Sequence, residues 1–180
     1  MAMTLITNSA DTDSTDLASI SFTSSIDSTY KLYIFKLIDL NPATNNKWIS
    51  FQGSIDSGSN YNVAMTTTFF RSFHSEDDGT ATLEYGGGND QAQGTAFQSL
   101  TYYIGNGADE SASGTLWLFN PSNTTYVKHW YSRVSSYTGD NMHNDTFAAG
   151  YFNDANDIDA IQFKMSSGNM DGVIKMYGVG

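Results

Sequence analysis

The sequence contains no cysteine, which excludes a disulfide framework, a thiolate nucleophile and a thiolate metal site. Long apolar runs are also missing, so no stretch resembles a membrane helix. The first residues, MAMTLITNSADTDSTD, lack the basic segment and the apolar run of a secretory signal peptide. We therefore expect synthesis in a cytoplasm and no association with a membrane.

Basic residues are scarce as well. Eight Lys and Arg against 19 Asp and Glu give a formal net charge of −11. Nucleic-acid binding needs a basic stripe, and anionic membranes attract basic segments, so the balance argues against both partners. Charged residues make up only 15% of the chain, below the usual level of about a quarter. The polar surface must therefore come mainly from Ser, Thr, Asn, Gln and Gly.

Aromatic residues are abundant, at 14% of the chain, and they favour strands and bury large apolar areas. Segments of alternating or continuous apolar residues recur between turn sequences, at the spacing of a β-sandwich or barrel. The predicted strands cover residues 19–22, 30–40, 47–55, 61–73, 83–85, 96–104, 114–119, 126–137, 146–152, 161–165 and 173–179. No long helical period interrupts them.

The closing stretch, residues 158–179, shows this pattern most clearly. Ile161, Phe163 and Met165 alternate with polar residues, which is typical of a strand with one buried face. Turn residues follow, and a second apolar segment runs to Val179. We interpret the stretch as a hairpin whose second arm lies deep in a sheet.

The fold class predicted from these segments is all-β, a single antiparallel β-sandwich of jelly-roll type. Residues 1–20, rich in Ser, Thr and Asp, form an expected N-terminal lead-in, and residues 21–180 form the sandwich domain. The chain opens with Met and ends one residue after a predicted strand, so we expect a free-standing module.

Two groups of aspartates have a spacing that can bind Ca²⁺. One comprises Asp154, Asp157 and Asp159, and the other falls between residues 11 and 16. Neither has the Gly and distal Glu of an EF-hand loop, so solvated turn chemistry is the favoured interpretation. We expect no cofactor, with calcium as the open alternative.

Catalytic residues are not indicated. His74, His129 and His143 lie on unrelated segments, and no nucleophile elbow is present. The carboxylates stand in no context that predicts a raised pKa, although Asp residues could serve as a glycosidase pair. We therefore expect a protein without enzymatic activity.

Tryptophans and tyrosines could form a platform that stacks on sugars, although core or interface positions are more common for such residues in a sandwich. Trp130 is the best exposed candidate because basic and polar residues surround it in KHWYSR. With its neighbours His129 and Tyr131, it is the predicted surface for ligand contact. Trp48 and Trp117 are the other tryptophans.

Several runs in a fixed order carry a likeness to known proteins. They lie at residues 26–30 (IDSTY), 41–44 (NPAT), 89–98 (NDQAQGTAFQ), 111–129 (SASGTLWLFNPSNTTYVKH) and 162–178 (QFKMSSGNMDGVIKMYG). Together they resemble a family of small virion proteins and fibre-associated modules of marine tailed phages, including cyanophages. The likeness begins near residue 26 and includes no catalytic residues.

The resemblance implies a non-enzymatic virion structural protein, displayed on the particle as a capsid decoration or cement protein or as a fibre or tail subunit. Expected partners are the major capsid protein or tail and fibre proteins, with further copies of the chain in a homo-oligomer, for which we expect a trimer. Lysis releases such a protein, so no secretion signal is needed. The alternative is a carbohydrate-binding module of a tail fibre that recognises glycans of the host surface.

Overall fold

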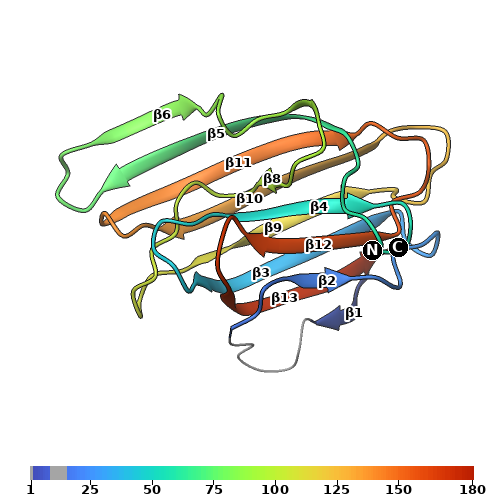
Figure 1. The fold of residues 1–180 in the computed structure, drawn as a ribbon, viewed down its shortest axis with the longest axis horizontal. Coiled ribbons are helices and arrows are strands. Elements are labelled where there is room, and N and C mark those ends of the chain that lie inside the picture. Colours follow the sequence, from blue (N-terminus) through green and yellow to red (C-terminus); the bar gives the residue numbers. More distant parts are fainter. Residues whose placement is uncertain (1, 9–15) are drawn as a thin grey trace.

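The computed structural model describes residues 2–8 and 16–180, and all regular elements among these residues are strands. Two antiparallel sheets pack face to face, and Figure 1 shows β12 and β4 of the smaller sheet crossing over β3 and β9 of the larger one. The predicted all-β sandwich is confirmed. The jelly-roll type remains a prediction.

The larger sheet has nine strands. Their order is β1 (Met3–Asn8), β13 (Met170–Val179), β3 (Leu32–Pro42), β9 (Ala112–Phe119), β10 (Lys128–Tyr137), β11 (Met142–Phe152), β5 (Met65–Ser75) and β6 (Ala81–Tyr85). A short strand, β7 (Ala92–Gly94), pairs with the beginning of β5 on the same side as β6. Strands β9, β10 and β11 form a meander.

The smaller sheet has four strands, in the order β2 (Ile20–Phe22), β12 (Ala160–Met165), β4 (Ile49–Ser54) and β8 (Gln98–Ser99). Every residue of β4 is buried. One face of β4 turns to the core, and Gln52 on this strand donates to the carbonyl oxygens of Val63, Thr95 and Ala96. Irregular chain segments therefore cover the other face of β4.

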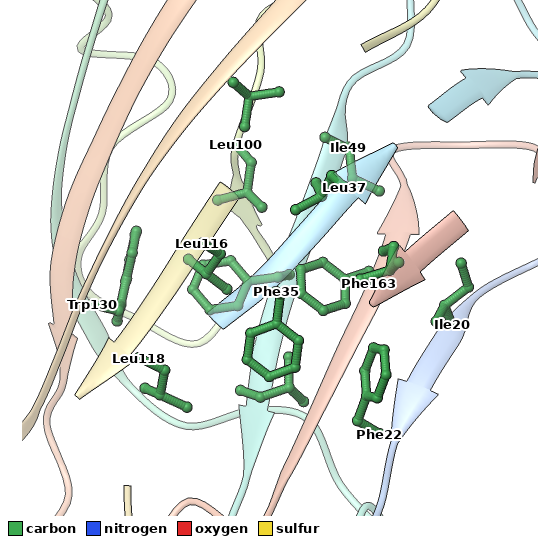
Figure 2. Close-up of a cluster of buried hydrophobic side chains, with 14 of the residues drawn as sticks. Ile20, Phe22, Phe35, Leu37, Ile49, Leu100, Leu116, Leu118, Trp130 and Phe163 are labelled. Carbon is green, nitrogen blue, oxygen red and sulfur yellow. The ribbon is translucent and has the colours of Figure 1, made fainter. Parts of the chain in front are cut away.

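The core between the sheets is built from aromatic and aliphatic side chains, as Figure 2 shows. Phe35 of the larger sheet lies 5.4 Å from Phe163 of the smaller one, measured between ring centroids, and 5.3 Å from Phe22. All three side chains are almost fully buried. Such burial stabilises the fold by roughly 1.5–3 kcal/mol for each large apolar side chain.

The closing stretch is not a hairpin, and that interpretation was wrong. Strand β12 pairs with β2 and β4, whereas β13 pairs with β1 and β3 of the other sheet. The turn between them carries the chain across the core. Gly172 is not in a turn either, because it forms a bulge in β13 with φ of 114°, and a Cβ there would lie 2.6 Å from the Asp39 carbonyl oxygen.

The described part of the expected lead-in joins the sandwich. Strand β1 forms the edge of the larger sheet beside β13, and Leu17 exchanges backbone hydrogen bonds with Met170. A domain boundary at residue 20 would therefore cut through the larger sheet.

The strand predicted at residues 96–104 is reduced to Gln98–Ser99. Gln98 is fully buried, and its side chain donates to the carbonyl oxygens of Asn89 and Ser99 and accepts from Thr67. These side-chain bonds satisfy backbone carbonyl groups around the two-residue strand, which itself pairs with β4. The buried side chain of Gln98 supplies hydrogen bonds that the pairing of a longer strand would otherwise supply, and apolar alternation in the sequence does not reveal this.

Candidate outer-face ligand site

Strand β10 alternates strictly between buried and exposed residues from Lys128 to Ser136. The indole of Trp130 is only 2% exposed and packs edge to face on Phe51, with centroids 4.7 Å apart. The prediction of an exposed Trp130 was therefore wrong. Its immediate neighbours His129 and Tyr131 belong to the opposite face, because successive side chains of a strand point in opposite directions.

His129 and Tyr131 lie on the outer face of the larger sheet, where they are exposed. Tyr131 stacks on Trp117 of the neighbouring strand, with ring centroids 4.6 Å apart and planes at 25°. His129 contacts Tyr151 edge to face at 5.9 Å. Two of the three residues predicted for ligand contact therefore belong to an aromatic surface, together with Trp117 and Tyr151, which the prediction did not include.

A shallow hollow of about 420 Å³ lies on this face, over β11. Its outward-facing residues are Thr66, Thr68, His129, Tyr131, Ala149 and Tyr151. Ala149 stands directly between Tyr131 and Thr68 in the strand register. The small methyl group between longer side chains creates the hollow, and we call this feature the outer-face hollow.

The hollow continues sideways into a row of apolar residues that follows the register across the sheet. This aromatic row consists of Tyr177, Ile34, Trp117, Tyr131 and Ala149, each directly opposite the next on neighbouring strands. Tyr131 is 44% exposed. Ile34 is only 8% exposed, so the rings that the row offers across the strands are those of Tyr177, Trp117 and Tyr131.

A second row, two residues along each strand, carries positive charge. This cationic row consists of Lys175, Lys36, Thr115 and Arg133. Lys36 donates to the Thr115 hydroxyl at 3.0 Å, and its Nζ lies 5.8 Å from the centroid of the Trp117 ring. The row holds three of the eight basic residues of a chain with net charge −11.

Arg133 is the member of the cationic row whose charge is matched. Its guanidinium forms an ion pair of 2.7 Å with Asp145, which raises the pKa of Arg133 through hydrogen bonding and charge. Lys36 and Lys175 stand directly opposite each other. Like charges in this arrangement destabilise a sheet, so an anion beside the two lysines would relieve the repulsion.

Two residues of the first acidic group, Asp154 and Asp159, accept hydrogen bonds from backbone N–H groups. Asp154 accepts from Asn156 in a turn, and the Asp159 carboxylate accepts from the backbone N–H of Ser57 at 2.9 and 3.0 Å. In residues 2–8 and 16–180, no three His, Cys, Asp or Glu side chains converge as a metal-binding group. Asp154, Asp157 and Asp159 are therefore not brought together as calcium ligands.

A buried lysine lies beside this acidic turn. Lys128 donates from Nζ to the Asp154 carbonyl oxygen at 2.9 Å. Burial lowers the pKa of the ammonium group, and the nearby charges of Asp154 and Asp157 partly oppose that effect. An internal cation thus already occupies the neighbourhood of two of the predicted calcium ligands.

The second acidic group falls mainly outside the described residues, which include Asp16 but neither Asp11 nor Asp13. The backbone N–H of Asp16 donates to the Asp171 carboxylate at 2.7 Å. Its own carboxylate accepts from Asn169 at 2.8 Å. Asp16 therefore anchors the chain against the turn that precedes β13.

Two of the three histidines are neighbours after all. His74 on β5 and His143 on β11 face each other in the register, while His129 lies near the other end of the sheet. His74 contacts Asp78 at 2.9 Å, and His143 contacts the Ser135 hydroxyl at 3.0 Å. The third histidine does not approach this pair, so a three-histidine zinc site is not formed.

Comparison of this chain with known proteins does not assign a family to it. No family model and no curated protein matches it. One solved structure, described as "structural genomics, unknown function" from Bacteroides ovatus, aligns with 6% identity and a TM-score of 0.31. The alignment covers 58% of this chain and 45% of that one.

Among the described residues, no helix has the length and apolar character to span a membrane.

The outer-face hollow could be found from the sequence only in part. The alternation of His129, Tyr131 and Arg133 marks one exposed face of a strand, which is a local signal. Thr66, Ala149 and Tyr151 join them only because β11 lies between β10 and β5. Strand order depends on long-range pairing, so no local pattern indicates these three residues.

Proposed function

We propose that this chain is a non-enzymatic structural protein of a tailed-phage virion, displayed on the particle surface as a capsid decoration or cement protein or as a fibre or tail subunit. The observation that carries the proposal is the ordered series of sequence runs that resemble small virion proteins. One of these runs contains β9, one ends at Gln98, and one covers most of β12 and β13. The jelly-roll topology is part of the same proposal.

Several residues of these runs form part of the hydrophobic core. Leu116 and Leu118 on β9, and Phe163 and Ile174 on β12 and β13, are fully buried. Gln98 anchors the irregular segment between β7 and β9. The presence of these core and anchoring residues within the runs supports a shared fold.

An apolar patch at the β5–β6 edge supports assembly with other chains. Phe70, Leu83 and Tyr85 are 41%, 72% and 58% exposed, and Phe70 stacks on Phe147 at 4.9 Å. We call these four residues the edge patch. Strand β6 is an exposed edge whose one charged residue, Glu84, is paired with Arg71. Exposed edge strands can pair with another chain, and aromatic patches are typical of interfaces. The patch suits a homo-oligomer, for which a trimer is expected, or a contact with capsid or tail proteins.

The direct test is protein identification in particles of the parent phage, purified through a density gradient and washed in high salt. We expect peptides of this chain in constant ratio to the major capsid protein, and cryo-electron microscopy should place a sandwich-shaped density on the head, tail or fibre. Intact particles without these peptides would refute the proposal.

Assembly is tested separately by light scattering of the purified protein. A Leu83→Lys variant should dissociate an oligomer formed through the edge patch, whereas Tyr126→Lys should not. Tyr126 is a suitable control because it is 70% exposed outside the sheets. A monomer at all concentrations would remove the homo-oligomer from the proposal.

A further inference from the structure

We propose that the outer-face hollow and the aromatic row form a binding site for an acidic polysaccharide, a sugar chain that bears carboxylate or sulfate groups. One sugar ring sits in the hollow beside Tyr131, and the chain continues across the strands along the aromatic row. The anionic groups face Lys36 and Lys175 in the cationic row. The inference concerns binding by the folded chain and does not depend on whether the chain belongs to a virion.

The hollow has the shape and lining that a pyranose ring needs. Tyr131 is stacked on Trp117 on the β9 side and lines the hollow on the β11 side. A sugar ring presents a face of C–H groups that packs on an aromatic ring. The methyl group of Ala149 leaves room for that ring, and the volume of about 420 Å³ lies in the lower range of small-ligand sites.

Polar groups at the rim can bind sugar hydroxyls. The Thr66 hydroxyl accepts from the Gln93 side chain at 2.6 Å, so its own proton can be donated to a ligand. The Asn153 side chain donates to Oε1 of Gln93 at 2.5 Å and so fixes the orientation of that side-chain amide. His129 and Thr68 are exposed at the same hollow. An apolar floor with a few fixed polar groups is typical of sites that bind and orient small rings.

The charge of the ligand follows from the cationic row. Two residues along a strand correspond to about 7 Å, so substituents on sugars in the aromatic row reach the neighbouring row. Lys36 and Lys175 face each other there without an acidic residue between them in the register. Acidic groups elsewhere on the chain are screened over about 8 Å at physiological salt. The local charge therefore favours an anionic polymer over a neutral one.

Affinity electrophoresis in native gels that contain alginate, a polyuronate, tests the site, with gels that contain neutral dextran in parallel. We expect alginate to retard the wild-type protein and dextran to leave it unaffected. Tyr131→Ala and Ala149→Trp should each raise the dissociation constant for alginate at least tenfold, the first by removing the stacking surface and the second by filling the hollow. A Lys36→Gln/Lys175→Gln variant should bind more weakly, and 1 M salt should weaken wild-type binding.

Matched controls are Tyr126→Ala and a Lys31→Gln/Lys47→Gln variant, which remove the same groups outside the two rows. Both should bind as the wild type does, and all variants should remain folded at the temperature of the assay, because the changed side chains lie outside the core. No retardation by alginate, equal retardation by dextran, or unchanged binding by Tyr131→Ala and Ala149→Trp would each overturn the inference. A dimer that Tyr131→Ala dissociates would also overturn it, since a second copy would then cover this face.

Discussion

Phe51 of the smaller sheet and Trp130 of the larger sheet meet edge to face, with ring centroids 4.7 Å apart and ring planes at 83°. The contact joins the two layers of the sandwich within the core, and Figure 2 shows Trp130 beside the other buried side chains of the larger sheet. Trp130 thus points into the core. Tyr131, the next residue in the chain, points to the other side of the sheet and stacks on Trp117 there. Stability and ligand binding should therefore depend on different members of this adjacent pair.

Replacing each residue of the pair by alanine tests this separation. We expect Trp130→Ala to lower the free energy of unfolding by about 3–5 kcal/mol, because it leaves a cavity in the core. Tyr131→Ala should lower it by only about 1 kcal/mol, the value of an exposed aromatic pair. Urea unfolding measures both. Similar losses for the two variants would show that the alternation of β10 is not as described.

Phe163 is the central aromatic residue of β12, fully buried against Phe22, Phe35 and Phe51. Phe163→Ala should cost about 3–5 kcal/mol of unfolding free energy. Phe70→Ala is the matched control, because it removes the same atoms from a side chain that is 41% exposed, and it should cost about 1 kcal/mol. Denaturant midpoints at a constant slope give both values. A negligible loss in Phe163→Ala would contradict its place in the core.

Arg71 is an almost buried arginine with defined partners on three sides. Its Nη2 lies 2.7 Å from Oε1 of Glu84, and its Nη1 donates to Oδ1 of Asn144 at 2.7 Å. The guanidinium carbon is 3.4 Å from the centre of the Tyr102 ring. A lysine has neither the planar fork nor the reach for all three contacts. Arg71→Lys should therefore cost about 1–3 kcal/mol, mostly from unpaired buried groups.

The control for that prediction is Arg133→Lys, which changes the same group in the ion pair with Asp145. The Arg133 side chain is 62% exposed, and exposed ion pairs contribute about 1 kcal/mol or less. Thermal unfolding of the two variants should therefore show a clearly larger shift for position 71. Equal shifts in melting temperature would mean that the buried contacts of Arg71 stabilise the fold no more than an exposed ion pair does.

Lys128 makes stability depend on pH. Burial lowers the pKa of its ammonium group in the folded protein, below the 10.5 of an unperturbed lysine. Between the lowered pKa and 10.5, the unfolded chain binds more protons than the folded one, so the unfolding free energy rises with pH over this window. Below this window Lys128 is charged in both states, and the burial of its ammonium group lowers the unfolding free energy. Lys128→Met removes the titrating group and should abolish this rise.

The measurement for Lys128 is the difference in unfolding free energy between wild type and Lys128→Met, from pH 7 to pH 10.5. We expect the unfolding free energy of the wild type to rise relative to that of the variant as pH increases. Other groups contribute to both proteins, including Tyr33, whose pKa is raised by burial, and their effects cancel in the difference. A difference that stays constant with pH would contradict the prediction.

Local pattern was sufficient to predict most of the strands. The two apolar faces of β3 and the alternation in β12 follow directly from Phe35, Leu37, Phe163 and their neighbours, because a buried strand face must be apolar. The all-β class followed from the same periodicity. The short strand β7 was missed, and Met3–Asn8 was assigned to the lead-in, since edge strands contain few buried residues to mark them.

Sheet membership was not predictable in this way. Strands β12 and β13 are separated by a short turn, and such a turn normally joins a hairpin. Here Phe163 pairs with Phe51, and Ile174 pairs with Leu37 of the opposite sheet. The choice between a hairpin and a crossing depends on partners more than 100 residues away. The same long-range pairing places Ala149 beside Tyr131 and so forms the candidate site.

The pairing of β1 with β13 and of β2 with β12 has a consequence for the order in which the chain folds. Strands from the first 22 residues find their partners only among residues 160–179. On the ribosome, the early strands must therefore wait for nearly the whole domain to be synthesised. Folding dominated by such distant pairings is slow, on the order of milliseconds to seconds, and unpaired edges are exposed to aggregation in the meantime. A truncation that removes β13 should leave a nascent chain that depends on chaperones.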